Sequence, residues 1–391
     1  MTFAFHRRQA FAVLGAAALL LAGCGSDGGG GESSTAASPS ASGQASGFDA
    51  ESYFKGKTVR IIVTSSAGGN TDIFARYIAT KLPDAIPGKP RIAVTNEGGL
   101  GGIGDVYEAP EEDLVIGSSS RSSLLYGTAD DPAARQDPEK IQVVGGIAGE
   151  PRAWVAFGDL ANAYPSLADA AGKTDGVKLK LAATVGGPGE VESDVFLYSW
   201  LCENMKLPCD YISVADDSSS DSNLMVQRGE VNMQGGTMIT FMRDYIKDLQ
   251  DKKAKFLFQY APTDQPTAPL PDGITAPDIS TILPADLKDD YDKIVPIISS
   301  GKLGNMLWAG PAMPADVVKV LSDAYAKVIG DADNAAQVSS LMAGGNSPYE
   351  YKVNPLTGDD AQKAYDDSAG VFEDNKDYIE GLREQYAKLW Q

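Results

Sequence analysis

Histidine is nearly absent from this sequence: His6 is the only one among 391 residues. It lies in an N-terminal segment with the features of a cleaved export signal, so the mature protein is expected to contain none. Ser-His-Asp catalysis, Cys-His catalysis and histidine-ligated zinc are thereby excluded. An exported enzyme would have only carboxylate, Ser-Lys or metal-carboxylate chemistry left, and no paired motif for any of these stands out. We therefore expect that the protein is not an enzyme, has no catalytic residues and binds no metal or cofactor.

Basic residues are also scarce, with 33 Lys and Arg against 53 Asp and Glu and a formal net charge of −20. The charge becomes −22 when the signal, which holds Arg7 and Arg8 and no acidic residue, is removed. Nucleic-acid binding needs basic patches, so this balance argues against a nucleic-acid partner. Solubility of an exported protein accounts for most of the acidic charge.

Only three cysteines occur, and the first has a clear context. Arg7-Arg8, the apolar run Ala10–Leu21 and then Leu21-Ala-Gly-Cys24 together match a bacterial lipoprotein signal. We predict a signal peptide over residues 1–23 and lipidation of Cys24, which anchors the protein to the outer face of the cell membrane. The alternative is an ordinary secretory signal with an incidental cysteine, which the position directly after Leu-Ala-Gly disfavours.

The other two cysteines, Cys202 and Cys209, are seven positions apart, between a predicted helix and a predicted strand. Outside the cytoplasm such a pair is expected to form a local disulfide that staples the turn at Pro208. A reactive thiol pair is the alternative, but no basic neighbour is evident that would lower either thiol pKa.

No later segment is long and apolar enough to be transmembrane, so the lipid is the only expected membrane attachment. Residues Gly25–Gly47 are mostly Gly, Ser and Ala and cannot bury enough apolar surface to fold, so residues 24–50 form a lipidated tether. Such a chain reaches roughly 25–30 Å. The remaining chain, about 340 residues, exceeds what one hydrophobic core usually supports, and two lobes are expected.

Two glycine-rich loops stand out in this remainder. Val59–Val63 predicts a strand, Thr64–Asn70 a loop, and apolar residues at helical spacing predict a helix up to Leu82. A second strand, Arg91–Val94, leads to the second loop, Asn96–Gly104. Glycines allow close approach of the main chain to a ligand, and amides at a helix N-terminus attract anions without a basic side chain.

Part of the second loop, Gly99–Gly104, also fits the G-x-G-x-x-G pattern of dinucleotide-binding folds. Pro110 follows too soon for the crossover helix of that fold, and an exported lipoprotein would rarely meet NAD. A dinucleotide site therefore ranks well below an anion site.

With these residues the chain resembles the substrate-binding receptors of tripartite tricarboxylate transporters, the Bug family. The first loop, Ala67-Gly-Gly-Asn-Thr-Asp72, matches the family pattern Ala-Gly-Gly-x-Thr-Asp, and Asn96–Gly102 matches Asn-Arg-Pro-Gly-Ala-Gly-Gly in part. Segments Gly187–Gly189, Arg228–Met233 and Trp308–Pro314 follow in the family's order. The resemblance covers the chain from about Lys57 to the C-terminal helices and identifies a divergent, lipoprotein form.

The sequence departs from the family in two places. Glu97 and Gly98 replace the usual Arg-Pro, and Gly187–Ser193 reads Gly-Pro-Gly-Glu-Val-Glu-Ser where the family has Gly-x-Gly-Ser-Ser-Thr. Glu190 either lies in a first helical turn, where it complements the dipole, or faces the ligand and favours an amine-bearing one.

The resemblance implies an α/β, periplasmic-binding-protein-like fold of type II (Venus flytrap), with the ligand in the cleft between two lobes. Lobe one would comprise Glu51–Gly149 plus Ala261–Gln391, and lobe two Glu150–Tyr260. Thr237 serves either as a ligand contact or as a helix N-cap, and the hydroxyls at Ser118 and Ser119 either contact the ligand or cap a turn. The expected ligand-binding residues are Ser65, Ser66, Ala67, Gly68, Gly69, Thr71, Asp72, Gly101, Gly102, Ile103, Gly104, Ser118, Ser119, Gly189, Glu190, Gly236 and Thr237.

The function implied is an extracytoplasmic solute-binding lipoprotein that captures a small organic carboxylate and delivers it to the membrane subunits of a tripartite tricarboxylate-type transporter. We expect a monomer that closes around its ligand by hinge motion. Because the amide-rich loops lack a basic residue, main-chain N–H groups and small hydroxyls are expected to hold the carboxylate. A ligand-sensing lipoprotein that feeds a signalling partner, and an exported histidine-free enzyme, stay as alternatives.

Overall fold

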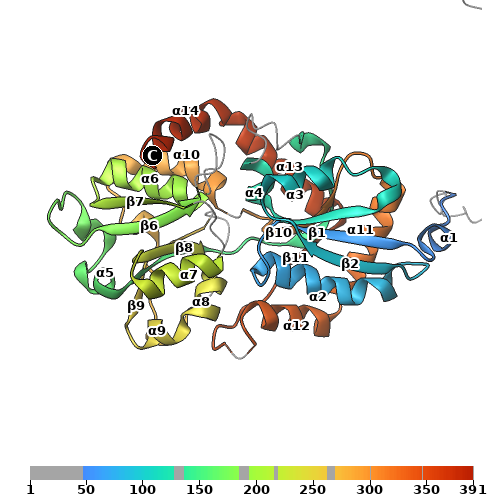
Figure 1. The fold of residues 1–391 in the computed structure, drawn as a ribbon, viewed down its shortest axis with the longest axis horizontal. Coiled ribbons are helices and arrows are strands. Elements are labelled where there is room, and N and C mark those ends of the chain that lie inside the picture. Colours follow the sequence, from blue (N-terminus) through green and yellow to red (C-terminus); the bar gives the residue numbers. More distant parts are fainter. Residues whose placement is uncertain are drawn as a thin grey trace, which may run out of the picture. The chain divides into compact units, whose positions relative to one another are not determined.

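Two separate groups of strands organise the structure (Figure 1). The computed structural model describes residues 47–126, 136–184, 193–214, 219–261, 269–299, 301–345 and 347–390. The predicted signal peptide, Cys24, Gly189 and Glu190 lie outside these ranges. The larger sheet has six strands in the order β11-β4-β10-β3-β1-β2, and the other group has a three-stranded sheet, β8-β5-β9, and the pair β6-β7.

The strands are β1 Thr58–Val63, β2 Arg91–Asn96, β3 Val115–Ser120, β4 Gln142–Ile147, β5 Arg152–Phe157, β6 Leu179–Thr184, β7 Cys209–Val214, β8 Met233–Thr237, β9 Ala254–Tyr260, β10 Asn305–Ala309 and β11 Pro355–Thr357. The helices are α1 Ala50–Phe54, α2 Asn70–Ala85, α3 Gly99–Tyr107, α4 Arg121–Tyr126, α5 Gly158–Ala163, α6 Ser193–Met205, α7 Ser219–Arg228, α8 Met238–Asp244, α9 Ile246–Gln250, α10 Lys288–Ile298, α11 Ala315–Ile329, α12 Ala332–Met342, α13 Gly358–Asp374 and α14 Lys376–Ala387.

Helices cover both faces of the larger sheet, which is why its central strands are apolar on both sides. In β1, Ile61 packs into one core with α2 and α11, while Ile62 faces a second core with α3 and α13. Strands β1, β2 and β3 are parallel, so their carboxyl ends meet at one edge of the sheet. Strand β10 enters antiparallel between β3 and β4 and completes the sheet.

A third core surrounds the other strand group. Trp154 and Phe258, from β5 and β9, pack there against α6, and residues of α10 and α14 contribute to the same core. At the C-terminus, the Trp390 indole donates to Oγ of Ser199 on α6 at 3.0 Å. The last helix therefore packs against α6, in the part of the chain that carries the smaller sheets.

Cys202 and Cys209 form a disulfide, with their Cα atoms 6.0 Å apart. The bridge joins the last turn of α6 to the first residue of β7, across the turn that holds Pro208.

Three local expectations differ from the structure. The second glycine loop is short, because α3 begins at Gly99. From its sequence, the segment Glu230–Met233 is predicted to be a strand. The strand lies later, as β8, because pairing with β5 draws Gln234, Gly235 and Gly236 into the sheet. The segment Ile239–Leu249 is predicted to be one helix, but it is split at Tyr245 into α8 and α9.

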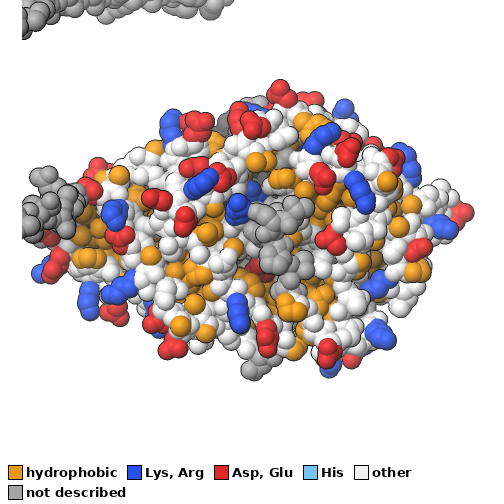
Figure 2. All heavy atoms as spheres, turned by 180° about the vertical axis from the view of Figure 1, so that it is seen from behind, with side chains coloured by type: hydrophobic (Ala, Val, Ile, Leu, Met, Phe, Trp, Pro, Cys, Tyr) orange, Lys and Arg blue, Asp and Glu red, His pale blue; other side chains and the backbone are white. Residues whose placement is uncertain are grey.

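No helix in the described ranges combines the length and the apolar character needed to cross a bilayer. On the face shown in Figure 2, acidic and basic side chains are interspersed and do not form a basic patch.

Candidate functional site

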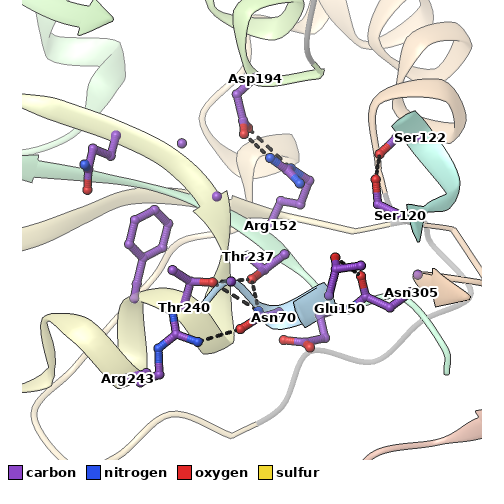
Figure 3. A pocket seen from close by; sticks show the side chains of 18 of the residues that line it. Asn70, Ser120, Ser122, Glu150, Arg152, Asp194, Thr237, Thr240, Arg243 and Asn305 are labelled. Atoms are coloured by element: carbon purple, nitrogen blue, oxygen red, sulfur yellow. Dashed lines mark hydrogen bonds and ion pairs between the residues drawn. The ribbon is translucent and has the colours of Figure 1, made fainter. Parts of the chain in front are cut away.

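A cleft of about 290 Å³ opens between the two strand groups (Figure 3). Its walls come from the carboxyl ends of β3 and β4, the start of α2, the start of β5, the β8–α8 junction and the first turn of α6. The lining residues are Gly69, Asn70, Thr71, Ser120, Arg121, Ser122, Ala148, Gly149, Glu150, Arg152, Leu181, Ala182, Asp194, Val195, Asn223, Val231, Met233, Gln234, Gly235, Gly236, Thr237, Thr240, Phe241, Arg243, Gly304 and Asn305.

The N-terminus of α2 faces this cleft with its first amides uncapped. Gly69 occupies the N-cap position in an extended conformation, and among the described residues no side chain accepts a hydrogen bond from the first turn. The first N–H groups of a helix have no partner inside the helix, and the helix dipole makes that end attractive to anions. The start of this 16-residue helix therefore presents main-chain N–H donors to the cleft, an arrangement that is favourable for anions.

Asp72 holds the loop that precedes α2. Its carboxylate accepts hydrogen bonds from the Gly68 amide at 2.9 Å, Arg76 Nε at 2.8 Å and Asn96 Nδ2 at 2.9 Å. Gly68 has a φ of +83°, a conformation that glycine adopts without strain. Burial would raise the pKa of Asp72, but these hydrogen bonds outweigh it and lower the pKa below its ordinary value. Asp72 is thus a charged support for the loop and does not line the cleft.

Thr71 and the serines of β3 also have structural partners. The Thr71 hydroxyl lines the cleft and donates to Asn305 Oδ1 at 2.8 Å, which ties α2 to β10. Ser118 and Ser119 are fully buried. The Ser119 hydroxyl accepts from Trp308 Nε1 at 2.9 Å, so its oxygen is engaged inside the sheet.

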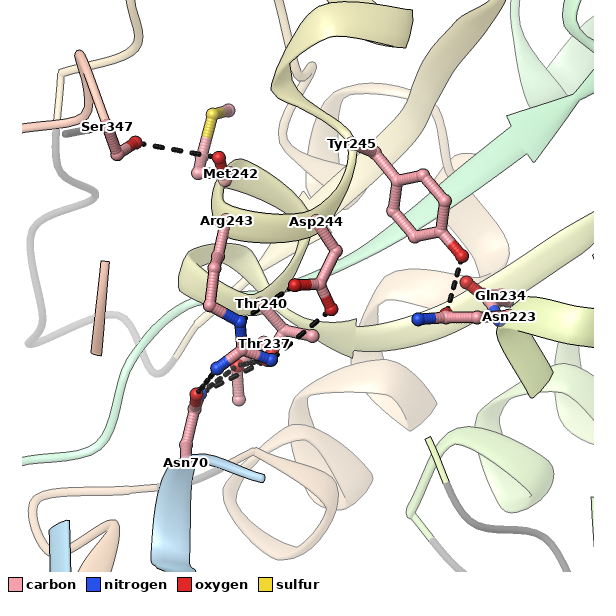
Figure 4. A network of polar contacts seen from close by, with 10 residues as sticks. All are labelled: Asn70, Asn223, Gln234, Thr237, Thr240, Met242, Arg243, Asp244, Tyr245 and Ser347. Carbon is pink, nitrogen blue, oxygen red and sulfur yellow. Dashed lines mark hydrogen bonds and ion pairs between the residues drawn. The ribbon is translucent and has the colours of Figure 1, made fainter. Parts of the chain in front are cut away.

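A polar network joins α2 to the β8–α8 junction (Figure 4). Asn70 Nδ2 donates to the hydroxyls of Thr237 and Thr240, each at 3.1 Å, and Asn70 Oδ1 accepts from Arg243 Nη1 at 2.8 Å. Arg243 also pairs with Asp244 through Nε at 2.7 Å and Nη2 at 3.2 Å. Thr237 does occupy the N-cap position of α8, yet its side chain makes no capping hydrogen bond and contacts Asn70 instead.

Arg152 and Asp194 form an ion pair inside the cleft (Figure 3). Arg152 begins β5 and Asp194 lies in the first turn of α6. The Asp194 carboxylate also accepts from the Tyr260 hydroxyl at 2.9 Å and from Trp154 Nε1 at 3.3 Å. Burial would lower the pKa of Arg152, but the charge of Asp194 outweighs it and raises the pKa.

Glu150 lies in the connection between β4 and β5 and is buried. Burial raises the pKa of this carboxyl to about 8, although the Tyr351 hydroxyl, the Ile239 amide and Arg243 act in the opposite direction. Its Oε2 has no hydrogen-bond partner among the described residues. At neutral pH Glu150 is therefore mostly protonated and adds little negative charge to the cleft.

The structure brings Gly69, Thr71, Gly236 and Thr237 together in the cleft, out of the residues expected from the sequence to bind a ligand. The other described members of that set do not line it. These are Ser65, Ser66, Ala67, Gly68, Asp72, Gly101, Gly102, Ile103, Gly104, Ser118 and Ser119.

The second loop has a structural role at Gly102. A Cβ built on Gly102 would lie 1.9 Å from the Glu97 carbonyl oxygen, so close packing explains that glycine.

Sequence reasoning missed the polar side chains that dominate the cleft, above all Arg121, Arg152, Asp194 and Arg243. Arg152 and Asp194 are 42 positions apart, and nothing in either segment indicates that they meet. One feature of the sequence could have indicated Arg152 as a cleft residue. It directly follows Gly149-Glu-Pro151, the segment that connects the two strand groups.

The described residues contain no group of three or more His, Cys, Asp and Glu placed to hold a metal ion.

Comparison with known proteins identifies the fold. The sequence matches no protein-family model and no curated protein. Among similar solved structures, R. palustris Rpa4515 with adipate has a TM-score of 0.58 at 15% identity, over 85% of this chain and 97% of that chain. MatC (Rpa3494) from Rhodopseudomonas palustris with bound malate has a TM-score of 0.55 at 16% identity, over 86% and 99%. The periplasmic binding protein BugD has a TM-score of 0.54 at 16% identity, over 85% and 96%. This chain therefore has the two-lobed α/β fold of periplasmic binding proteins.

Proposed function

We propose that this chain is an extracytoplasmic solute-binding lipoprotein, of the kind that serves tripartite tricarboxylate-type transporters. It captures a small organic carboxylate in the cleft between its strand groups and delivers it to the membrane subunits. It acts as a monomer and is not an enzyme. The similar structures with malate and with adipate support a carboxylate ligand, and the likeness to BugD supports this receptor class.

One observation carries the proposal: the uncapped N-terminus of α2 lines the cleft. The amides of its first turn point an unsatisfied row of donors and the positive end of the helix dipole at any ligand there. Arg152 and Arg243, by contrast, are already paired with carboxylates. A ligand carboxylate is therefore held by main-chain N–H groups, and each charge-assisted hydrogen bond contributes roughly 1.5–3 kcal/mol.

Gly69→Val tests this site directly. Gly69 has φ −72° and ψ 169°, which valine adopts readily, and a Cβ there would meet only the Ser66 carbonyl oxygen, at 3.5 Å. The variant should fold, place bulk at the mouth of the amide site and lose affinity about hundredfold or more, in calorimetry against a panel of carboxylates.

Gly98→Val is the matched control. Gly98 is the N-cap of α3 with nearly the same backbone angles, φ −67° and ψ 157°, and nothing lies within 4 Å of a Cβ there. It does not line the cleft, so affinity should stay within about threefold of wild type. If Gly69→Val keeps the wild-type affinity and Gly98→Val loses affinity, the ligand binds at the second loop and not at α2. Failure of the folded wild type to bind any carboxylate would defeat the proposal.

Delivery to a transporter needs a separate test. A strain that lacks this chain should lose uptake of the carboxylate identified by calorimetry, and the membrane-anchored protein should restore it. Normal uptake without the chain, together with a lost transcriptional response to the same ligand, would favour the sensing role.

A further inference from the structure

Three arginines line the cleft. Arg121, at the start of α4, is buried and donates from Nη2 to the Ser299 carbonyl oxygen. Arg152 and Arg243 lie on the wall formed by β5, β8 and α8, and each already has a carboxylate partner. Arg243 is engaged by Asp244 and Asn70 through its Nε, Nη1 and Nη2 atoms. Arg152 directs Nε and Nη2 to Asp194. An incoming anion would therefore meet guanidinium groups whose positive charge a protein carboxylate already neutralises.

The N-termini of two long helices reach the cleft, and they differ in one respect. At α2 the only first-turn carboxylate, Asp72, turns back to the Gly68 amide and leaves the cleft-facing amides open. At α6 the first-turn carboxylate, Asp194, faces the cleft and pairs with Arg152. One wall therefore offers main-chain donors to an anion, while on the other wall a carboxylate of the protein already occupies the guanidinium of Arg152.

Asp194 is fixed in that position. Besides Arg152 it has the Tyr260 hydroxyl and the Trp154 indole as donors, and only 10% of its side chain is exposed. On its other side lies Gly235, where a Cβ would come within 2.5 Å of Asp194 Cγ, so the backbone of β8 leaves room for this carboxylate. Displacing Asp194 would leave a buried charge unpaired, which is strongly unfavourable.

From this asymmetry we propose that Asp194 is a specificity-determining residue that selects ligands with a single carboxylate. It acts as a built-in anion on Arg152, so the distal end of the ligand is an uncharged or hydrogen-bonding group and not a second carboxylate. This proposal rests on the proposed function, since it assumes that the first carboxylate binds at α2. It narrows the ligand class to small monocarboxylates.

Matched pairs of acids test the proposal, because hexanoate and adipate, or butyrate and succinate, share a chain length and differ only in the second carboxylate. In calorimetry the wild type should bind each monocarboxylate about tenfold or more tighter than its dicarboxylate partner. Asp194→Asn keeps the shape and frees the positive charge of Arg152, so it should shift the ratio at least tenfold toward the dicarboxylates.

Tyr260→Phe is the control, because it removes one donor to Asp194 without changing any charge; its ratio should stay within about twofold of wild type. A wild type that binds both members of each pair equally, or prefers the dicarboxylates, overturns the role of Asp194 while leaving the proposed function standing. So does a folded Asp194→Asn with an unchanged ratio. Should that variant fail to fold, the wild-type ratio decides alone. If the folded wild type binds neither these four acids nor any other member of the carboxylate panel, both proposals fall.

Discussion

Arg243 on α8 and Asn70 at the start of α2 are joined by a 2.8 Å hydrogen bond from Nη1 to Oδ1. Helix α2 lies against the larger sheet, whereas α8 directly follows β8 of the other strand group. Asn70 also donates to the hydroxyls of Thr237 and Thr240. This one asparagine therefore connects both walls of the cleft, directly beside the open amides of α2.

Asn70→Ala should remove all of these contacts. The free energy of unfolding should fall by about 1–3 kcal/mol, because the two hydrogen bonds to the threonines are neutral and contribute about 0.5–1.5 kcal/mol each, while Arg243 keeps Asp244 as a partner after the third is lost. Urea denaturation measures the loss. Thr80→Ala on the same helix is the control, since the exposed Thr80 hydroxyl donates only to the Tyr77 carbonyl. Equal unfolding curves for the two variants would show that the network does not stabilise this arrangement.

Asp72→Asn should destabilise the protein at neutral pH and much less in acid. The pKa of Asp72 is lowered in the folded state, so its contribution is present above the ordinary carboxyl pKa of about 4 and is lost as pH falls through the lowered value. Thermal unfolding of wild type and variant between pH 2 and pH 7 should therefore converge at the acidic end. Because Asp72 supports the loop without lining the cleft, ligand affinity should suffer less than in Gly69→Val. A constant gap between the melting curves would contradict the assignment.

Glu150→Gln should change how the free energy of unfolding depends on pH between weakly acidic and weakly alkaline conditions. The raised pKa, about 8, means that the folded state keeps its proton while the unfolded state, with an ordinary carboxyl, loses it. Stability of the wild type should then fall as pH rises from about 5 to 8, by at most about 1.4 kcal/mol per pH unit, and level off above that. The glutamine variant should lack this slope. Glu230→Gln, an exposed carboxylate, serves as the control and should keep the wild-type slope.

The disulfide between Cys202 and Cys209 should stabilise the protein modestly, because it closes a loop of only seven positions. Replacing both cysteines by serine is expected to lower the free energy of unfolding by about 2–3 kcal/mol. Denaturant titration gives that value. Mass spectrometry of the exported protein should find the two residues linked, and two free thiols would refute the pairing.

Cys24→Ser should release the protein from the membrane fraction with its fold intact, because the predicted lipid is the only expected membrane attachment. Cell fractionation and circular dichroism of the released protein check both parts of this expectation. Unchanged membrane association of the variant would rule out lipidation at Cys24.

The local pattern of apolar residues was sufficient to predict the first long elements of the fold. Apolar runs bounded by glycine predicted β1 and most of α2, although the helix continues through Pro83 to Ala85. A proline near the C-terminal end removes one hydrogen bond without ending the helix. Pattern failed at β8, because Gly235 and Gly236 have low intrinsic strand preference and are held extended by pairing with Trp154 and Ala153 of β5.

The sequence located the candidate site only at loops that lead into a helix, namely Gly69 and Thr71 before and in α2, and Gly236 and Thr237 before α8. Gly69 and Thr71 belong to a contiguous motif in which a loop leads into a helix, and that arrangement is legible in sequence. The arginines of the cleft are not, because their role depends on partners supplied by other elements. Arg152 would have been interpreted as a cation available to a ligand, and only the fold shows that Asp194 already neutralises it.

Strand β10 also determines when the larger sheet can form. Leu307 pairs with Ser118 of β3 and Trp308 with Val143 of β4, so the middle of this sheet joins residues far apart in the chain. Contacts of such long range form late and slow the folding of a domain. A chain that ends before Asn305 would leave β3 and β4 with unpaired edges, which invite proteolysis and aggregation. Limited proteolysis of that truncated chain should therefore degrade it within the time that the full-length protein resists, so nearly the whole chain must be available before the larger sheet becomes protected.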